Sequence, residues 1–409
     1  MLKISPSLDS FCKKFKNKEN QIIWMSIKSD LDTPVSAYLK ICKKKENTFL
    51  LESVQDGTYR GRYSIVGTEP DLLWKCNNGI AYIKKINDSN KISEFIEQKD
   101  SPLISLKKVI NYSKINIPKN LPPMASGLIG YLSYETVELY EKLPKRKKKT
   151  IPVPDGFFIR PTVMAIFDSI KNEVLFACPC WYGIDINPKK IYEDLVGKIE
   201  KSIKSLADSN LKSNYKNNKY LYKKPTSNIN KAMFFSMVNK AKKYIFEGDI
   251  FQVVLSQRFK TKFLLPPFEL YRSLRSLNPS PFLFYMNYKD DKQSSFSLIG
   301  SSPEILVKLE NKKITIRPIA GTRIRGKNAK EDIQLKNDLL SDPKELAEHL
   351  MLLDLGRNDV GKISKINSVK VTEKMKVELY SHVMHIVSNV TGIAKNAKDI
   401  INILMSGFP

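Results

Sequence analysis

The sequence predicts an α+β fold, and two contrasting patterns carry that prediction. Before residue 205, short segments rich in Val, Ile, Phe and Tyr alternate with turn signals such as Asp56-Gly57 and Asn78-Gly79, as strands joined in hairpins do. After residue 228, longer helical patterns stand between the strands. Hairpin strands together with segregated helices favour α+β over a doubly wound parallel sheet.

The part of the chain before residue 205 is predicted to consist mainly of strands. These are expected at 48–54, 62–66, 80–84, 162–167 and 173–178, with one helix at 188–206. A surface loop is expected at 141–156, where a run of charges is combined with three prolines.

A polar stretch at 205–228 is rich in Asn, Lys and Ser and has no amphipathic period. We interpret it as a linker between two regions, 1–204 and 229–409. A helix is predicted just after it, over 230–247, and Gly248 is expected to end that helix. The apolar residues of this helix recur at three- and four-residue intervals: Phe234, Val238, Ala241 and Ile245. Further strands are expected at 250–259, 296–300, 304–309 and 313–319, and further helices near 330–341 and 343–355.

The net charge of +26 raises the question of nucleic acid, because a basic surface can neutralise phosphates. The excess comes from 57 lysines against 11 arginines, whereas the reading of bases favours the planar guanidinium of arginine. The lysines are also dispersed in short runs without a nucleic-acid-binding motif. We therefore favour a solvated, lysine-rich surface and no nucleic-acid partner, and keep a nucleic-acid-binding protein as the weaker alternative.

The sequence shows no sign of a membrane segment or a secreted protein. No stretch approaches the roughly 18 uninterrupted apolar residues of a membrane span, and the first residues lack the apolar core of a secretory signal. The five cysteines are scattered and include no CxxC pair: Cys12, Cys42, Cys76, Cys178 and Cys180. We expect a cytoplasmic protein whose thiols are reduced.

The segment 312–326 has the most informative pattern, an alternating strand that runs into a turn. Gly321 lets backbone N–H groups approach a ligand closely. Thr322, Arg323 and Arg325 offer donors that suit carboxylates or phosphates. An anion site and a plain charged hairpin turn are both consistent with this pattern.

The same turn nearly matches a phosphate-binding loop. Residues 321–328 read GTRIRGKN, close to the pattern GxxxxGK[ST]. Asn328 replaces the hydroxyl residue that should hold magnesium, and the residues that follow lack the apolar run of a helix under a nucleotide site. A nucleotide site is therefore not favoured.

The segment 341–364 is typical of a long helix with a capped start. Asp342 is placed to cap it, Pro343 to occupy its first position and Glu345 to complete the cap. Glu345 and Glu348 share one stripe of the helix, and two carboxylates there can supply oxygen ligands for Mg2+. A capping role and a metal role stay open for Glu345, whereas Glu348 has no capping role.

The apolar face of this helix is predicted to consist of Leu346, Leu350 and Leu353. His349 is a weak metal candidate because the HExxH pairing is absent. His385 falls in an alternating strand, on the same face as Val383 and Val387. A satisfied core histidine and an acid/base role both remain possible for it.

Eight ordered segments resemble the anthranilate synthase component I family, within the larger group of chorismate-utilising enzymes. Three lie near the C-terminus: PIAGTRIRG, DPKELAEHLMLLDLGRNDVGKIS and HVMHIVSNVTG. Five lie upstream: LLES, GRYSIVG, GLIGYLSYE, NPSPFLFY and SSPEILV. The resemblance spans nearly the whole chain and implies two packed, mostly antiparallel sheets flanked by helices.

The resemblance implies the first step of tryptophan biosynthesis. Ammonia attacks the ring of chorismate with loss of its hydroxyl, and elimination of pyruvate leaves anthranilate. Residues 229–409 would form the chorismate-binding catalytic region, with Gly321 and Thr322 in contact with chorismate. Residues 1–204 would form a regulatory or structural region.

The resemblance also implies a catalytic set. Glu348 would bind a Mg2+ ion that bridges to the substrate carboxylate, with Glu345 as a weaker ligand. Glu304 and His385 would assist departure of the hydroxyl, beside Thr322. A carboxylate and imidazole pair can move protons near neutral pH.

One residue separates two related activities. Aminodeoxychorismate synthase typically carries Lys where this chain has Ala320, and a lysine amine can serve as a covalent nucleophile. Ala320 therefore favours free ammonia as the nucleophile and anthranilate as the product. The resemblance implies that a glutamine amidotransferase subunit, anthranilate synthase component II, supplies the ammonia within a heterotetramer.

The resemblance implies a second site, for feedback inhibition by tryptophan. Its residues would be Ser53 of LLES together with Pro281, Phe282 and Leu283. The family usually has PYM where this chain has PFL, so a hydroxyl and a thioether are replaced while the apolar wall is kept.

The chain ends at NILMSGFP, where the family continues into a glycine-rich GTVSGAPK segment. That segment supplies further chorismate contacts and the second magnesium carboxylate in the family. We therefore expect little or no synthase activity from the 409-residue chain by itself. The alternative to a lyase subunit is a non-catalytic remnant that retains partner or tryptophan binding.

Overall fold

The computed structural model describes residues 4–43, 45–55, 59–86, 94–144, 151–182, 187–208, 223–290 and 295–408. The chain forms two compact units, one of Met1–Leu211 with Tyr271–Pro409 and the other of Lys212–Leu270. Three predicted features fall wholly or partly outside the described residues: the Asp56-Gly57 turn, the middle of the 141–156 loop and most of the 205–228 linker.

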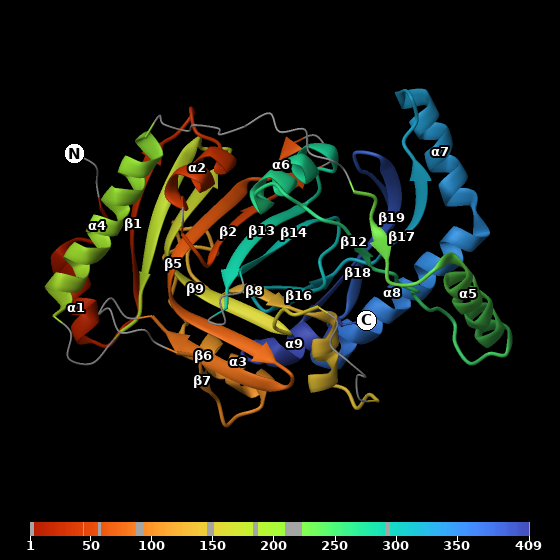
Figure 1. The fold of residues 1–409 in the computed structure, drawn as a ribbon, viewed down its shortest axis with the longest axis horizontal. Helices are drawn as coiled ribbons and strands as arrows, with labels where there is room; N and C mark the ends of the chain where they lie inside the picture. Colours follow the sequence, from red (N-terminus) through yellow and green to blue (C-terminus); the bar gives the residue numbers. More distant parts are fainter. Residues whose placement is uncertain are drawn as a thin grey trace. The chain divides into compact units, whose positions relative to one another are not determined.

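The first unit contains a large antiparallel sheet (Figure 1). Its main path runs in the order β1-β10-β9-β5-β2-β13-β14, and β6, β7 and β8 pair at its side. The strands are β1 (Gln21–Lys28), β2 (Thr48–Glu52), β5 (Tyr63–Asn77), β6 (Ile80–Lys85), β7 (Ile96–Glu97), β8 (Ile129–Leu132), β9 (Gly156–Asp168), β10 (Glu173–Cys180), β13 (Phe282–Lys289) and β14 (Ser295–Ser302). A short separate hairpin pairs β3 (Val54–Gln55) with β4 (Tyr59–Arg60).

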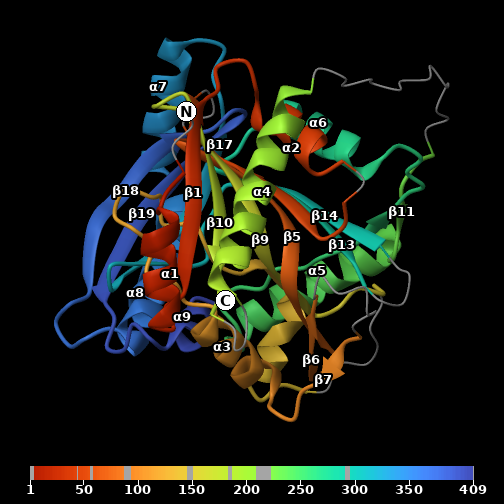
Figure 2. The ribbon, with the colours of Figure 1, turned by 90° about the vertical axis from the view of Figure 1, so that its left-hand side faces the viewer.

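One face of this sheet is covered by helices α1 (Leu8–Lys16), α2 (Pro34–Ile41) and α4 (Pro188–Ala207). Figure 2 shows α4 lying along β1 and β10. The helix α4 buries Leu195, Ile199 and Leu206, which recur at the spacing of one helical stripe. This stripe fixes the helix against the sheet.

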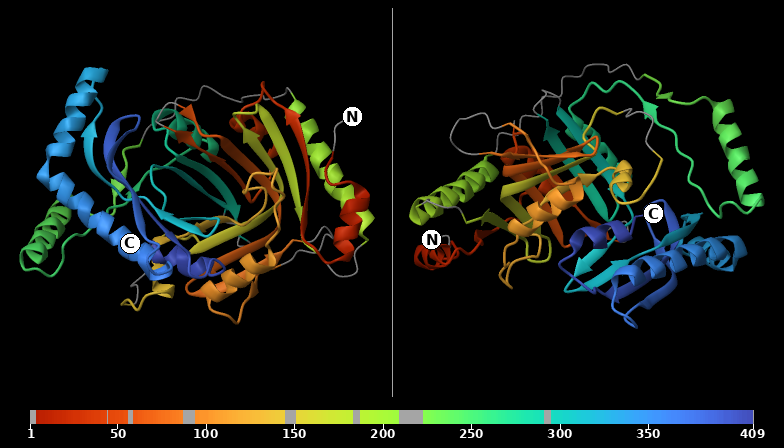
Figure 3. Two further views of the ribbon diagram at one scale, coloured as in Figure 1. Left: turned by 180° about the vertical axis from the view of Figure 1, so that it is seen from behind. Right: turned by 90° about the horizontal axis from the view of Figure 1, so that it is seen from below.

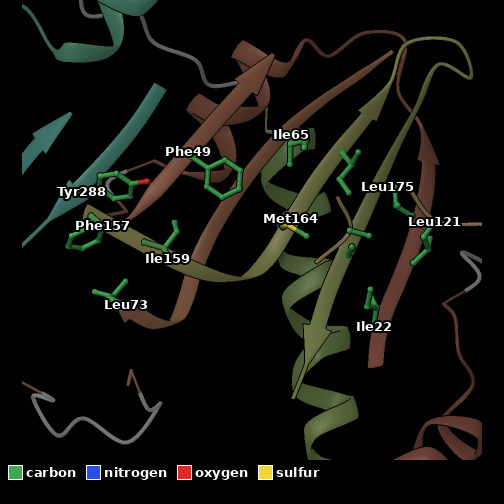
Figure 4. Close-up of a cluster of buried hydrophobic side chains, with 13 residues drawn as sticks. Ile22, Phe49, Ile65, Leu73, Leu121, Phe157, Ile159, Met164, Leu175 and Tyr288 are labelled. Atoms are coloured by element: carbon green, nitrogen blue, oxygen red, sulfur yellow. The ribbon is translucent and has the colours of Figure 1, made fainter. Parts of the chain in front are cut away.

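The opposite face carries a cluster of buried apolar side chains (Figure 4). Leu175 of β10 points to this cluster, whereas its neighbour Phe176 points to the other face and is also buried. Phe157 and Met164 of β9 are fully buried in the same cluster, and Leu121 from the loop after α3 (Pro102–Tyr112) covers it. Burial on both faces explains why these strands are nearly continuous in apolar residues.

A second antiparallel sheet holds five strands among the described residues: β15 (Lys308–Glu310), β16 (Lys313–Ile316), β17 (Ile319–Ile324), β18 (Lys370–Leu379) and β19 (Val383–Ile393). The strand β19 is central because it pairs with β16, β17 and β18. The long helix α8 (Pro343–Ile363) packs on β17 and β19, and α7 (Ala329–Ser341) precedes it.

The short helix α9 (Ile400–Ser406) contacts the cores of both sheets. Its Ile401 and Met405 join a cluster with Trp74 of β5, and its Ile403 joins a cluster with Leu353 of α8. Figure 3 shows α9, in dark blue, beside α8 and α3. The two sheets are therefore linked through one helix with opposite apolar faces.

The second unit contains the helix α5 (Lys231–Phe246) and a two-residue ladder between β11 (Thr226–Ser227) and β12 (Phe259–Lys260). The predicted helix is confirmed, and Gly248 follows it with a φ of 82°. The predicted strand at 250–259 is wrong, because only its last residue belongs to a ladder. Within this unit, no described segment pairs with 250–257, and an unpaired strand has no hydrogen bonds to hold it.

The α+β prediction is confirmed, together with most of the strands predicted before residue 205 and the helix at 188–206. The strand predicted at 304–309 is reduced to β15, and the one predicted at 313–319 is split into β16 and β17. The split falls at Arg317 and Pro318, since a proline lacks the N–H that a ladder needs. In the large sheet, β2 from before the predicted linker pairs with β13 from after it. The assignment of roles to 1–204 and 229–409 stays a prediction.

In the part of the chain that the structure describes, no helix has the length and apolar character required to cross a membrane.

The buried face of α8 differs from the predicted one. It consists of His349, Leu353, Gly356 and Val360, with Asp359, whereas Leu350 is 45% exposed. The sequence pattern predicts Leu350 on the buried face because it stands one turn after Leu346.

This difference can be tested on two leucines of one helix. Leu353→Ala should lower the free energy of unfolding by about 2–5 kcal/mol, because it opens a cavity between α8 and the second sheet. Leu350→Ala should cost less than about 1 kcal/mol. Urea unfolding of both variants measures the difference, and equal losses would contradict the packing described here.

Candidate active site

The candidate site is built at an irregularity in the pairing of β17 with β19. Ala320 lies opposite Ile386 and Thr322 lies opposite His385, so Gly321 is an extra residue in β17. This is a β-bulge, and Gly321 adopts the left-handed conformation with a φ of 76°. The bulge puts Ala320 and Thr322 on opposite faces, although residues two apart normally share one.

A side chain at position 321 would be strained and crowded. A Cβ built there would lie 3.0 Å from Cδ1 of Ile386 and 3.4 Å from Oε2 of Glu345. Without a side chain, the carbonyl of Gly321 approaches Nδ1 of His385 at 3.1 Å. Glycine is therefore required by conformation and by space.

His385 and Thr322, two predicted site residues, are in direct contact. Oγ1 of Thr322 lies 3.0 Å from Nδ1 of His385. His385 is half-buried on the face opposite to Met384 and Ile386, which are fully buried. It is therefore not a core histidine.

The core histidine of this sheet is His349 of α8. It is fully buried, and its Nε2 lies 2.7 Å from Oγ of Ser388. Burial lowers the pKa of His349, so the neutral ring is favoured. The weak metal role considered for His349 has no support in this geometry.

The first turn of α8 brings a carboxylate to the bulge. Asp342 caps the helix by accepting hydrogen bonds from the N–H groups of Lys344 and Glu345, at 3.0 and 3.3 Å. The carboxylate of Glu345 does not return to the cap. Its Oε2 instead accepts a hydrogen bond from the N–H of Thr322 at 3.2 Å. The contacts therefore do not support the capping role that was left open for Glu345.

Glu348 stands one turn further along α8 and is half-buried. Glu345 and Glu348 share a stripe of the helix at the bulge end of α8. Among the described residues, no group of three or more His, Cys, Asp or Glu side chains is arranged to hold a metal ion. Any metal at this place would therefore rest on the pair of carboxylates with water or substrate.

Glu304 follows β14, and its backbone N–H lies 3.3 Å from Oγ of Ser302. Glu304 has a large solvent-accessible surface, but the protein around its carboxyl group removes part of the hydration of that group. This desolvation raises the pKa of Glu304. Its charge also raises the pKa of Tyr380, after burial and the neighbouring Glu378. The ring of Tyr380 in turn lies 5.3 Å from that of His385.

The two arginines of the turn are not free to bind an anion. Arg323 donates to Asp338 at 2.6 Å and to Asp342 at 2.8 Å. Arg325 donates to both carboxylate oxygens of Asp332, at 2.8 and 3.2 Å. Of the two readings left open, these contacts favour the charged turn for both arginines, since Asp338, Asp342 and Asp332 already pair with them.

The near match to a phosphate-binding loop is also explained. The N–H of Gly326 donates to Asp332 at 2.7 Å, and the N–H of Lys327 donates to Glu331 at 2.7 Å. Asn328 caps α7 by accepting from the N–H of Glu331. The backbone donors that a phosphate would need are thus filled by the chain's own carboxylates.

The residues predicted for tryptophan binding lie together on the other sheet. Leu283 of β13 pairs with Glu52 of β2, so Ser53 and Phe282 come one residue beyond that pair. Leu283 is 1% exposed and Phe282 is 41% exposed. Pro281 precedes β13 and is half-buried.

Sequence reasoning missed the residues that hold Glu52, the neighbour of Ser53. Glu52 is buried and accepts hydrogen bonds from Tyr271 at 2.6 Å and from Arg275 at 2.6 and 2.9 Å. Both partners lie in α6 (Pro267–Leu277), more than two hundred residues away in sequence. It also missed Arg317, Glu378 and Tyr380, whose only sequence signal is that they flank the matched motifs.

Comparisons with known proteins show the family of this chain. A family model described as chorismate binding enzyme matches residues 50–409. Anthranilate synthase component 1 of Cereibacter sphaeroides is 44% identical over 403 residues, which cover 98% of this chain and 79% of that protein. The corresponding protein of Neisseria meningitidis serogroup B is 40% identical over 93% of this chain and 75% of its own length.

A solved structure extends the match to three dimensions. Anthranilate synthase component I from Streptococcus pneumoniae superposes with a TM-score of 0.68 at 32% identity, over 93% of this chain and 78% of that chain. The fold and these matches thus define a chorismate-binding enzyme. Within that class, the chain belongs to the anthranilate synthase component 1 family.

The bulge can be tested by pairing Gly321 with a second glycine of almost the same conformation. Gly79 has a φ of 75°, and a Cβ built there would meet nothing within 4 Å. Gly79→Ala should therefore cost only the conformational strain, about 1–2 kcal/mol. Gly321→Ala should cost more, because it also pushes on Ile386.

Chemical denaturation of the two variants measures the difference. An equal cost at the two positions would show that close packing at the bulge does not matter.

Proposed function

We propose that this chain converts chorismate and ammonia to anthranilate and pyruvate, as the large subunit of an anthranilate synthase. The observation that carries the proposal is the convergence at the bulge. Thr322 contacts His385 through its hydroxyl and Glu345 through its N–H, so a proposed substrate contact, a proton carrier and a carboxylate of the metal stripe meet within hydrogen-bond distance. Family membership supports the same reading.

Chorismate would bind at Gly321 and Thr322. Chorismate is a small cyclic dicarboxylate, and a glycine bulge lets it come close to backbone and hydroxyl groups. Arg323 and Arg325 are already paired with aspartates, so the substrate would bind at the bulge itself rather than at these arginines.

Glu348 would hold Mg2+, with Glu345 as the weaker ligand. Two carboxylates on one helical stripe fit Mg2+, which takes one or two protein carboxylates and keeps several waters. Glu345 is the weaker candidate because one oxygen already accepts from Thr322 and the other lies 4.0 Å from Arg323. When bound, Mg2+ would supply positive charge for the substrate carboxylate.

Glu304 and His385 would move the protons that accompany loss of the ring hydroxyl. Because its pKa is raised, Glu304 is more often protonated near neutral pH than an ordinary glutamate, as suits a proton donor to a departing hydroxyl. His385, held at the bulge by Gly321 and Thr322, would exchange a proton on the same substrate.

The alternative, aminodeoxychorismate synthase, lacks support at Ala320. An alanine has no amine to attack the ring, so the nucleophile would be ammonia from outside the chain. A glutamine amidotransferase subunit would supply that ammonia within a heterotetramer in the cytoplasm. The tryptophan that the pathway produces would bind at Ser53 and residues 281–283.

The proposed activity is tested by anthranilate fluorescence with chorismate, an ammonium salt and Mg2+. The assay is run on the chain alone and with a C-terminal fragment of a relative that carries the GTVSGAPK segment. Anthranilate in either case supports the proposal. Its absence in both, beside an active full-length relative, would argue for the non-catalytic alternative.

The metal role of Glu348 is tested in whichever of these preparations is active. Glu348→Gln should weaken the apparent affinity for Mg2+ at least about 10-fold, since the amide keeps the shape but loses the charge. Asp354→Asn is the matched control, because Asp354 lies on the same helix and pairs with Arg357 at the surface. An unchanged Mg2+ dependence in Glu348→Gln would remove Glu348 from the site.

Feedback inhibition gives a separate prediction. Saturating tryptophan should lower the rate of the complete enzyme, and Ser53→Ala should raise the tryptophan concentration needed by about 10-fold through loss of one hydrogen bond. Ser205→Ala, on α4, is the control. A rate that tryptophan leaves unaltered would reject the site.

A further inference from the structure

His385 belongs to a row of three residues that runs across the second sheet. It lies opposite Thr322 of β17 on one side and opposite Glu378 of β18 on the other. Directly opposed residues point to the same face of a sheet. The row Thr322, His385 and Glu378 therefore lines one face.

Glu378 is hydrogen-bonded to the tyrosine whose ring packs against His385. The phenol of Tyr380 donates to Oε2 of Glu378 at 3.1 Å. The guanidinium of Arg317 donates to the other oxygen, Oε1. Both carboxylate oxygens are thus engaged, and the carboxylate has a fixed orientation.

Tyr380 is held at both ends. Its backbone carbonyl accepts from Arg325 at 2.7 Å, and its phenol is tied to Glu378. Its ring meets the ring of His385 edge-on, with centroids 5.3 Å apart and an interplanar angle of 67°. A tyrosine anchored in this way restricts the rotation of the imidazole.

The other side of the imidazole is fixed by hydrogen bonds. The carbonyl of Gly321, 3.1 Å from Nδ1, can only accept, so this contact is a hydrogen bond when Nδ1 carries the hydrogen. The hydroxyl of Thr322 lies 3.0 Å from the same nitrogen. In the neutral ring, Nε2 then has no hydrogen and can accept a proton.

The geometry points to Glu378 as a positioning residue for His385. Through Tyr380 it holds the imidazole in the orientation in which Nδ1–H meets the carbonyl of Gly321 and Nε2 is the proton-accepting atom. The role in catalysis rests on the proposed function, whereas the orientation and the tautomer do not.

The chain itself supplies a reference for the tautomer. It has three histidines, His349, His382 and His385. Nε2 of His382 lies 2.8 Å from the carbonyl of Leu277, so His382 must carry its hydrogen on Nε2, the opposite of His385. His349 is buried against Ser388.

The first experiment is a long-range 1H–15N correlation spectrum of the chain labelled with 15N-histidine. It is recorded at about pH 8, where an ordinary histidine of pKa about 6.5 is neutral. Replacement of His382 or His385 by Gln assigns the signals. We expect His385 as the Nδ1–H tautomer and His382 as the Nε2–H tautomer, and an Nε2–H tautomer for His385 would overturn the proposal.

The second experiment removes the anchor. Glu378→Ala should give His385 averaged nitrogen shifts, because Tyr380 is released, and Glu378→Gln should restore most of the original signal, because an amide oxygen still accepts from the phenol. Glu373→Ala is the matched control, since Glu373 is on the same strand and also forms an ion pair, with Lys376. Unchanged His385 signals in Glu378→Ala would overturn the proposal.

Tyr380→Phe keeps the proposal testable if Glu378→Ala does not fold, since it keeps the ring and removes only the link to Glu378. Averaged His385 shifts in Tyr380→Phe support the proposal, and native shifts contradict it. In the active preparation, Glu378→Ala should lower kcat by about 10- to 100-fold with little change in KM for chorismate. If His385 has the expected fixed tautomer but the protein has no activity, the proposed function is refuted and the positioning role is not. If the protein is active and Glu378→Ala leaves kcat unchanged, the positioning role is refuted and the proposed function is not.

Discussion

The candidate site depends on one extra residue in the pairing of β17 with β19. Gly321 interrupts the alternation, so Thr322 joins His385 on one face while Ala320 joins Ile386 on the other. The same interruption turns the carbonyl of Gly321 to His385 and leaves the N–H of Thr322 for Glu345. Remove the bulge, and the threonine, the histidine and the helix carboxylate no longer meet.

Packing in the rest of the first unit fixes the position of α8 relative to the bulge. His349, Leu353 and Val360 bury the helix α8 against the sheet, which sets where Glu345 reaches the bulge. The helix α9 adds a second support, because Ile403 packs with the α8 core while Ile401 and Met405 pack with the large sheet. The proposed tryptophan residues lie on that large sheet, so the two proposed sites stand on separate sheets that share α9 as a packing neighbour.

Much of the fold could be predicted from sequence because its signals are local. The strand 162–167 and the helix 188–206 follow from apolar periodicity, and the cap at Asp342 follows from its spacing to Pro343 and Glu345. The strand at 250–259 could not be predicted reliably, since an apolar run becomes a strand only when a partner pairs with it. Nor does a sequence show that Arg323 and Arg325 are already neutralised, because Asp338 and Asp332 reach them only after α7 folds back.

The candidate site residues could be named from motifs, whereas the residues that pack around them could not. Gly321, Thr322 and Glu348 stand in segments that resemble a family, whereas the contact of Glu378 with Tyr380 depends on the register of β18 against β19. His385 was ambiguous in sequence because its strand has apolar residues on both faces. Only the structure shows that the buried histidine is His349.

The most direct test of this account is the binding of chorismate measured by calorimetry, with and without Mg2+, on the unaltered chain and on Thr322→Val. Valine keeps the shape of threonine and removes the hydroxyl that meets His385. The account predicts binding that requires Mg2+ and that weakens about 10-fold in Thr322→Val, as expected for the loss of one hydrogen bond. Binding that is equally strong without Mg2+ and in the variant would contradict it.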